Sequence, residues 1–386
     1  MSRNDDLIKQ YCPNGVEECS IAELCIPTNK GTLTQDKLTE KGKYPVINSG
    51  RELYGYYDSF NNDGERITIA SRGEYAGYIS YFNEKFWAGG LCYPYKVKDS
   101  NRLITKYLYY FLKYKEKYLM NNLVARGSIP ALNKMDVDKF KIPVPPMEVQ
   151  EEIVRILDKF TELEAELEAE LEARKKQYEY YRDNLLKFDE LVKICNIGDV
   201  CSVQSGGTPS KSKLKYWGGN IKWLGSTVCQ NQKNITSITD YITEEGYNNS
   251  SAKLIRKDST LIALVGATIG KIAFLPFEAA INQNVAAIYP NDLSQLNPSY
   301  LYYIMGTLYD KFQSLSHGKL AMANLSFIRN LKIPIPPLSE QERIVSILDK
   351  FDALVNDISE GLPAELNARR KQYEYYRDKL LTFSEK

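Results

Sequence analysis

Hydrophobic side chains recur every three or four residues from Ile153 to Phe188, and the same pattern returns near the C-terminus. This period places them on one face of an α-helix. Proline pairs at 145–146 and 336–337 precede the two stretches, and because proline cannot lie inside a helix, each helix should begin after its pair. Ser339 and Glu342 have the spacing of a capping box. Two helices of roughly forty residues, each about 60 Å long, are expected to pack against each other in an antiparallel pair.

The side chains expected to pack along this pair share the helical period and come from both stretches. They are Ile153, Leu157, Phe160, Leu163, Leu167, Leu171, Tyr178, Tyr181, Leu185, Ile344, Leu348, Phe351, Leu366, Tyr373, Tyr376 and Leu380. The acidic run from Glu162 to Glu172 is then a solvated face of the first helix. In the second helix, residues 361–363 read Gly-Leu-Pro and should kink or break it.

The two helical stretches are copies of each other. Residues 141–160 match 332–351 at an offset of 191, and residues 169–188 match 364–383 at an offset of 195, so the second copy has four extra residues. The sequence before each helix repeats more faintly: residues 69–77 with 262–270, 107–110 with 300–303, 125–133 with 316–324, and Cys19 and Cys25 with Cys195 and Cys201. The helical half of each repeat is nearly invariant, whereas the half before it has drifted in sequence. This contrast is the main evidence for how the chain is divided into domains.

These boundaries divide the chain into residues 1–140, 141–190, 191–331 and 332–386. In the first and third segments, short β-rich runs alternate with Gly, Asn and Ser turns. A helix near Thr105–Met120 closes the first, and one near Ser299–Leu315 closes the third. The prediction is an α+β protein: two globular domains, each a mixed β-sheet with helices, joined by two long helices in an antiparallel coiled coil with a pseudo-two-fold internal repeat.

Composition agrees with a folded protein of two or three domains: 386 residues, 43% hydrophobic, with a mean hydropathy of −0.40. No apolar run approaches the ~18 residues of a membrane helix. The polar N-terminus carries no signal peptide, and seven cysteines without a CxxC pair fit a reducing compartment. A cytoplasmic protein without membrane contact is expected.

The net charge of +1 hides an uneven distribution. Residues 1–140 carry 20 basic and 17 acidic side chains and residues 191–331 carry 13 and 8, whereas residues 141–190 carry 8 and 14. Candidate DNA-binding side chains combine cations, amides and aromatics in the two basic segments: Lys41, Lys43, Arg51, Arg72, Arg126, Ser128, Lys211, Lys213, Lys215, Tyr216, Trp217, Lys222, Asn231, Gln232, Lys233, His317 and Lys319. Cations neutralise phosphates, and Arg, Asn and Gln read base edges. A solvated surface can also be mildly basic, so charge alone leaves DNA binding open.

Catalytic patterns are mostly missing. His317 is the single histidine, which excludes histidine triads and multi-histidine metal sites within one chain. Residues 266–271 resemble a phosphate loop, but only three residues separate the glycines and Ile272 replaces the hydroxyl that would bind Mg²⁺. The cysteines show no zinc-ligand spacing. The chain is therefore expected to have no catalytic activity and no metal or cofactor of its own.

Two repeated motifs resemble a known family. The Ile-Pro-Val/Ile-Pro-Pro segments at 142–146 and 333–337 are each followed by a helix ending in Lys-Gln-Tyr-Glu-Tyr-Tyr-Arg-Asp. Together they resemble the specificity subunit of type I restriction–modification systems. Residues 205–210 (Ser-Gly-Gly-Thr-Pro-Ser) and 216–221 (Tyr-Trp-Gly-Gly-Asn-Ile) look like the start of a target recognition domain in that family. Val149 departs from the acidic residue usual at this position, which the second copy keeps.

The resemblance implies a DNA-specificity subunit in which each drifted domain reads half of a bipartite site and the helix pair sets the spacer. Partners would be double-stranded DNA, two methyltransferase subunits and, in a restricting complex, two motor–nuclease subunits. S-adenosylmethionine, ATP and Mg²⁺ would be held by these partner subunits, with S-adenosylmethionine on the methyltransferase subunits. The methyltransferase contacts are expected at Gln150, Glu151, Glu152, Gln341, Glu342 and Arg343. A self-standing or other-system DNA binder, or a coiled-coil scaffold, remain the alternatives.

Overall fold

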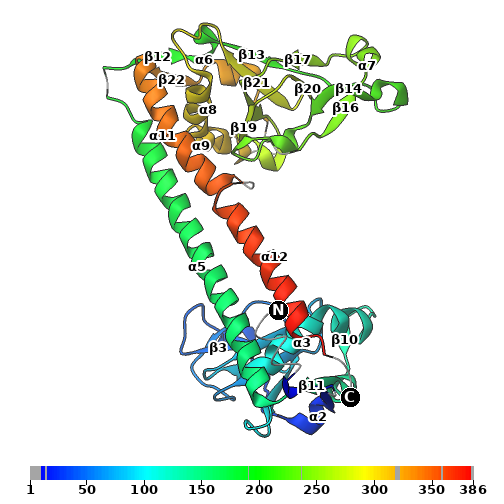
Figure 1. Cartoon of the computed structure of the whole chain (residues 1–386). Coiled ribbons are helices and arrows are strands. Elements are labelled where there is room, and N and C mark those ends of the chain that lie inside the picture. The colour runs from blue at the N-terminus through cyan, green and yellow to red at the C-terminus, as the bar shows by residue number, and fades with distance from the viewer. Residues whose placement is uncertain are drawn as a thin grey trace. The chain divides into compact units, whose positions relative to one another are not determined.

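The computed structural model describes residues 10–13, 15–189, 191–235, 237–317, 322–357 and 360–383. The chain forms two compact units (Figure 1). Unit 1 comprises residues 1–166 and 368–386, and unit 2 comprises residues 167–367. Each unit therefore combines one drifted segment with parts of both helical stretches.

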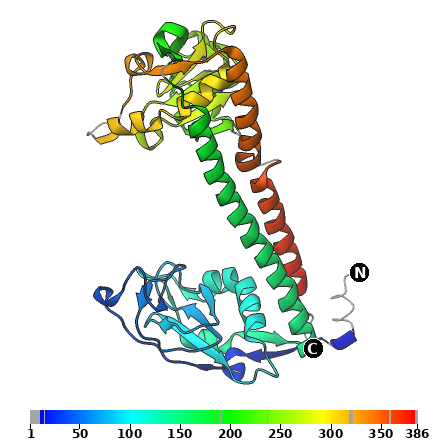
Figure 2. The ribbon, with the colours of Figure 1, turned by 90° about the vertical axis from the view of Figure 1, so that its left-hand side faces the viewer.

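Unit 1 contains a four-stranded antiparallel sheet, β2-β8-β5-β6, a three-stranded sheet, β4-β3-β7, and the strand pairs β1-β11 and β9-β10. Its elements are β1 (Glu17–Ser20), α2 (Ile21–Leu24), β2 (Cys25–Pro27), η1 (Gln35–Lys37), β3 (Tyr44–Ile47), β4 (Gly55–Tyr57), β5 (Arg66–Ala70), β6 (Ile79–Phe82), β7 (Trp87–Ala88), β8 (Cys92–Val97), α3 (Thr105–Asn122), β9 (Val124–Ala125), β10 (Ala131–Leu132), α4 (Lys134–Lys139), β11 (Lys141–Val144) and the first half of α5 (Met147–Leu185). Ile153 and Leu157 of α5 are fully buried in one core with Tyr107 of α3 and Ile67 of β5. The start of α5 thus belongs to the core of unit 1, and Figure 2 shows its ribbon beside the elements of that unit.

Unit 2 contains a five-stranded sheet, β13-β21-β18-β19-β15, a four-stranded sheet, β16-β14-β20-β17, and the pair β12-β22. Its elements are β12 (Lys193–Asn196), α6 (Ile197–Val200), β13 (Cys201–Ser205), η2 (Leu214–Tyr216), β14 (Trp217–Leu224), η3 (Ser226–Val228), β15 (Gln232–Asn234), β16 (Asp240–Ile242), α7 (Glu244–Asn248), β17 (Lys253–Ile255), β18 (Ser259–Ala263), η4 (Gly266–Thr268), β19 (Ile272–Leu275), β20 (Ala279–Ile281), β21 (Val285–Pro290), α8 (Pro298–Gly306), α9 (Tyr309–Gln313), η5 (Ser314–His317), α10 (Leu325–Arg329), β22 (Lys332–Ile335), α11 (Leu338–Asn356) and the start of α12 (Leu362–Leu380). Ile344 and Leu348 of α11 enter its core beside Tyr300 and Tyr303 of α8.

The helical stretches make the same aromatic contact in each unit. In unit 1, Phe160 of α5 stacks on Tyr376 of α12, with ring centroids 5.4 Å apart. In unit 2, Tyr181 of α5 stacks on Phe351 of α11 at 5.3 Å. Phe160 matches Phe351 in the repeat and Tyr181 matches Tyr376, so each contact joins one copy to the other. The N-terminal part of the first stretch thus pairs with the C-terminal part of the second, and the C-terminal part of the first pairs with the N-terminal part of the second. This is the antiparallel arrangement of the predicted α+β fold.

The second helical stretch is broken where Gly361 was predicted to break it. α11 ends at Asn356 and α12 begins at Leu362. A Cβ on Gly361 would lie 2.4 Å from the carbonyl oxygen of Ala353, so only glycine allows this close approach to the end of α11.

Two local expectations were wrong. The N-cap of α11 is Pro337, and no side chain caps this helix, so Ser339 and Glu342 do not form a capping box. The helix expected over Ser299–Leu315 divides into α8 and α9 after Gly306, because the main chain turns at Thr307. Within the described ranges, no helix combines the length and apolar character that crossing a bilayer requires.

Candidate nucleic-acid interface

Main-chain hydrogen bonds gather several loops of unit 1 at the C-terminal end of β5. The Ser71 N–H donates to the Leu91 carbonyl (2.9 Å), and the Leu132 N–H donates to the Ser71 carbonyl (2.8 Å). Arg72 forms a β-bridge with Ala131. These contacts join the loop after β5, the loop before β8 and the β9–β10 hairpin. We call this arrangement the loop framework.

Unit 2 forms the same loop framework with matching bonds. The Leu264 N–H donates to the Asn284 carbonyl (2.8 Å), and the Ala323 N–H donates to the Leu264 carbonyl (2.9 Å). Val265 forms a β-bridge with Met322. Each residue corresponds to its partner in unit 1 at the repeat offset of 193 or 191. The backbone is therefore held in the same way although the sequences have drifted.

The side chains carried by the loop framework differ between the units. The exposed Arg72 of unit 1 corresponds to Val265, and Gly90 corresponds to the exposed Gln283. Unit 1 thus presents a guanidinium where unit 2 is aliphatic, and unit 2 presents an amide where unit 1 has no side chain. Arginine favours phosphates and guanine edges, whereas glutamine favours adenine. A shared frame with different chemistry is what two readers of different sequences require.

Four predicted DNA-binding residues of unit 1 lie exposed on loops at or beside this framework: Arg51, Arg72, Arg126 and Ser128. The Arg51 guanidinium lies 4.9 Å from the ring centre of Tyr75, in the turn after β5. Lys41 and Lys43 are also exposed, but they precede β3 whereas Arg51 follows it, and their DNA contacts stay a prediction.

Two exposed lysines of the predicted cluster of unit 2 contact other side chains of the same unit. Tyr216 is 5% exposed, and its hydroxyl accepts a hydrogen bond from Lys213 Nζ at 3.1 Å. Lys215 forms an ion pair with Glu245. The burial of Tyr216 contradicts a role in stacking on a base. Lys211 is exposed, and its DNA contact stays a prediction.

Two further candidates of this region pack on neighbouring aromatic rings. The Trp217 ring meets Trp223 edge to face at 5.2 Å, and the Lys222 ammonium lies 4.0 Å from the ring centre of Phe277. Gln232 is exposed on β15. His317 lies in η5, and its side chain, like the whole of Lys319, falls outside the described residues.

Asn231 and Lys233 each make a contact that joins two elements of unit 2. Asn231 adopts φ 59°, and its Oδ1 accepts a hydrogen bond from the Ile272 N–H at 3.0 Å. Lys233 has 15% of its side chain exposed and forms an ion pair with Asp349 of α11. The Tyr303 hydroxyl donates to the same carboxylate at 2.5 Å. Because its ammonium is engaged by Asp349, Lys233 ties β15 to α11, which contradicts its predicted DNA contact.

Sequence reasoning missed this Asp349 junction, although it is repeated. In unit 1, Asp158 accepts hydrogen bonds from the Tyr110 hydroxyl at 2.5 Å and from Lys106 Nζ at 2.7 Å. Asp158 and Tyr110 match Asp349 and Tyr303 in the repeat, but Lys106 comes from α3 whereas Lys233 comes from β15. The identical Ile-Leu-Asp-Lys-Phe segments were the available signal.

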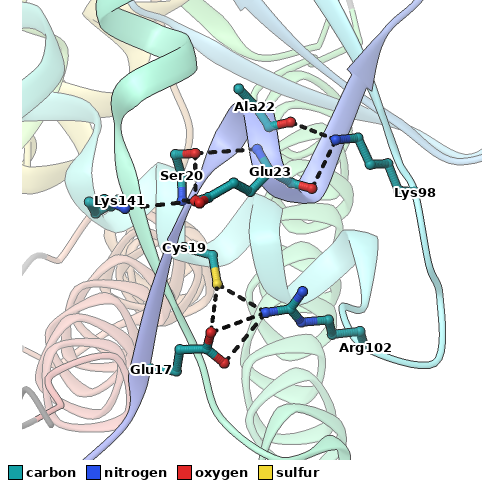
Figure 3. Close-up of polar contacts among 8 residues, drawn as sticks. All are labelled: Glu17, Cys19, Ser20, Ala22, Glu23, Lys98, Arg102 and Lys141. Carbon is teal, nitrogen blue, oxygen red and sulfur yellow. Dashed lines mark hydrogen bonds and ion pairs between the residues drawn. The ribbon is translucent and has the colours of Figure 1, made fainter.

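Gln150, predicted to contact a partner, is fully buried at the start of α5. Its Nε2 donates to the carbonyls of Arg102 (2.9 Å) and Pro145 (2.7 Å), and its Oε1 accepts from the Ile104 N–H (2.9 Å). The side chain of Arg102 is anchored separately, because its guanidinium lies 3.3 Å from a carboxylate oxygen of Glu17 (Figure 3). The segment before α3 is thus held at both its main chain and a side chain.

Gln341 forms the same three bonds at the start of α11. They join it to the carbonyls of Gln295 and Pro336 and to the Asn297 N–H, each at 2.8 Å. Like Gln150 it is fully buried. Burial contradicts the prediction that these two amides contact a partner; each instead attaches a helix to its domain.

The neighbouring charged residues differ in exposure. Glu151, Glu342 and Arg343 are exposed, whereas Glu152 is 9% exposed and pairs with Arg155 at 2.7 Å. Only the exposed members can form a surface at the helix starts. Among the residues with described coordinates, no group of three or more His, Cys, Asp or Glu side chains could hold a metal ion.

Comparison with known proteins gives a consistent result. The family model of the type I restriction modification DNA specificity domain matches residues 13–173 and again residues 189–368. The type I restriction enzyme EcoR124I/EcoR124II specificity subunit of Escherichia coli is 36% identical over 365 residues, which cover 88% of this chain and 87% of that protein.

Solved structures share the fold. The S subunit of a type I restriction–modification system from M. genitalium has a TM-score of 0.66 at 19% identity, covering 96% of this chain and 97% of that one. A chain solved in work on complex assembly and conformational transition of the type I R-M system has a TM-score of 0.58 at 18% identity, covering 96% and 98%.

The two matches to a DNA specificity domain, which together cover most of the chain, define it as a DNA-recognition protein. It belongs to the type I restriction–modification DNA specificity family, as its repeated motifs predicted, and is a specificity subunit.

Proposed function

We propose that each unit reads one half of a bipartite DNA site with the side chains on its loop framework. The observation that carries this proposal is the repetition of the framework bonds at Ser71 and Leu264 under different exposed side chains. Base readout needs side chains that differ with the target sequence, whereas their placement needs a fixed backbone. The chain would recognise DNA without catalysing a reaction.

Two methyltransferase subunits would then bind at related positions of the two repeats. The exposed Glu151, Glu342 and Arg343 at the helix starts are the candidate contacts that the structure leaves accessible. A pseudo-two-fold repeat suits this stoichiometry because it offers a similar surface twice. S-adenosylmethionine would be held by these subunits, and ATP and Mg²⁺ by two motor–nuclease subunits in a restricting complex.

Mapping of modified adenines tests the proposal. The chain is co-expressed with its companion methyltransferase, and random DNA is sequenced by a single-molecule method. The expected result is a two-part motif with a fixed unspecified gap. Random modification by a folded complex that still binds DNA would contradict it.

The continuous helix α5 offers a way to set that gap. Four residues added to a helix lengthen it by about 6 Å, close to two base-pair rises of about 3.4 Å. Duplicating residues 163–166 of the Leu-Glu-Ala-Glu pattern should therefore widen the gap and leave both half-sites the same. Inserting the same four residues between Asn83 and Glu84, in the exposed turn between β6 and β7 of unit 1, is the control and should leave the gap unchanged. An unchanged gap in the α5 variant would refute the length-setting role.

A further inference from the structure

Gln283 lies at an exposed, rigid turn between β20 and β21 of unit 2. The Asn282 N–H donates to the Leu224 carbonyl at 3.0 Å, and Asn282 Oδ1 accepts from the Asn284 N–H at 2.9 Å. The Asn284 carbonyl is itself a member of the loop framework. The backbone on both sides of Gln283 is thus fixed while its amide faces outward.

A threonine orients this amide. The Thr208 hydroxyl donates to Gln283 Oε1 at 2.6 Å. An amide oxygen has two lone pairs, so the contact leaves one of them and both Nε2 hydrogens available to a ligand. The side chain is therefore held in one orientation with a donor and an acceptor side by side.

The Ser-Gly-Gly-Thr-Pro-Ser motif explains how Thr208 reaches this place. The Gly207 N–H donates to the Ile281 carbonyl at 2.9 Å, and its carbonyl accepts from Trp223 Nε1 at 3.1 Å. A Cβ on Gly206 would lie 1.9 Å from the Ile281 oxygen. Only glycine permits this approach, so the motif brings Thr208 against the Gln283 turn.

Unit 1 contains the same arrangement without the amide. The Gly31 N–H donates to the Ala88 carbonyl at 2.9 Å, as Gly207 does to Ile281. Thr32 corresponds to Thr208, and Gly90 corresponds to Gln283. The Thr32 hydroxyl oxygen lies 3.3 Å from where a Cβ on Gly90 would stand. The threonine is present in both units, but unit 1 has Gly90 where unit 2 has Gln283.

We infer that Gln283 is a specificity-determining residue of unit 2 that reads an adenine, with Thr208 as its positioning residue. This inference rests on the proposed function. An oriented glutamine amide accepts from adenine N6–H and donates to N7, a pair of bonds that no other base offers in that order. The second half-site would therefore contain an A·T pair recognised by Gln283.

Binding to single-substituted duplexes tests this inference, with the full chain assembled with its companion methyltransferase. The Gln283→Ala variant should lose about tenfold or more of its preference for adenine at one base pair of one half-site. The Gln283→Glu variant should prefer cytosine there, because a carboxylate accepts from cytosine N4. Preferences in the other half-site should not change.

Thr208 supplies the positioning test. Thr208→Val, which removes the hydroxyl at nearly constant shape, should weaken the preference at the same base pair, and Thr208→Ser should restore it. Thr32→Val in unit 1 is the matched control and should alter no preference at that pair, because Gly90 stands beside Thr32 at the position of Gln283.

The outcomes separate the two proposals. A wild-type complex that selects no two-part motif would refute the proposed function. A wild-type complex with a clear motif and a Gln283→Ala variant with the same base preferences would overturn only the present inference. Equal weakening at every base pair by Gln283→Ala would also overturn it, since that result describes a backbone contact.

Discussion

Units 1 and 2 use the same main-chain bonds to hold different surface chemistry. Ser71 and Leu264 occupy matching positions and make the same two hydrogen bonds, although one is polar and the other aliphatic. Beside them, Arg72 is replaced by Val265. The framework is therefore specified by backbone geometry, which leaves the outward side chains free to differ between the two units.

The attachment of the helices shows the opposite behaviour. Gln150 and Gln341 are the same residue with the same three bonds, and Asp158 and Asp349 accept from equivalent tyrosines. Here the side chains themselves make the contacts. The glutamine, aspartate and tyrosine at these junctions are therefore the same in the two units, whereas the exposed Arg72 and Gln283 have no equivalent in the other unit.

Removal of a junction glutamine should have the largest effect. Gln150→Ala and Gln341→Ala each leave one N–H and two carbonyls without their partner, and each buried unsatisfied group costs about 1–3 kcal/mol. We expect each variant to lower the free energy of unfolding by about 3 kcal/mol or more, by similar amounts, in urea titrations. The exposed Glu151→Gln and Glu342→Gln are the controls. A loss below about 1 kcal/mol in either alanine variant would contradict the equivalence of the junctions.

Replacement of Arg72 by the residue of the other unit should have an intermediate effect. Arg72→Val removes a guanidinium that can contact guanine or phosphate, so affinity for the cognate site should fall about tenfold. Titrations over a range of salt concentrations measure this loss and show whether the salt dependence decreases. Lys41→Ala, at an exposed position outside the loop framework, should lose less affinity than Arg72→Val. A larger loss of affinity in Lys41→Ala than in Arg72→Val would contradict the placement of the DNA interface of unit 1 at its loop framework.

Replacement of the buried Asp352 should have the smallest effect, a change in how stability depends on pH. Asp352 is 6% exposed, and burial raises its pKa, whereas its counterpart in the first repeat is Thr161. A raised pKa in the folded state means that the contribution of Asp352 to stability is greatest at low pH and is lost as pH rises through the folded-state pKa.

We therefore expect wild-type protein to lose stability relative to Asp352→Asn between about pH 4, near the unfolded pKa, and pH 7. The difference in Tm should change by about 1–3 °C, as followed by thermal unfolding at each pH. A pH-independent difference for Asp352→Asn would contradict the raised pKa.

The sequence predicted those features that depend on local period or on identity between copies. The helical period, the repeat and the break at Gly361 are of this kind, and the structure has all three. The loop framework was not predicted, because its bonds join residues such as Ser71 and Leu132 that are distant in sequence and use no side chains. Lys233 was misread for a related reason, since Asp349 lies 116 residues further along the chain.

The backbone character of the framework bonds has an evolutionary consequence. Because the contacts of Leu264 with Asn284 and Ala323 use only peptide groups, a substitution at their outward-facing neighbours removes none of them. Such substitutions should be nearly neutral for folding. New target sequences can therefore arise by single mutations that selection does not first eliminate for instability.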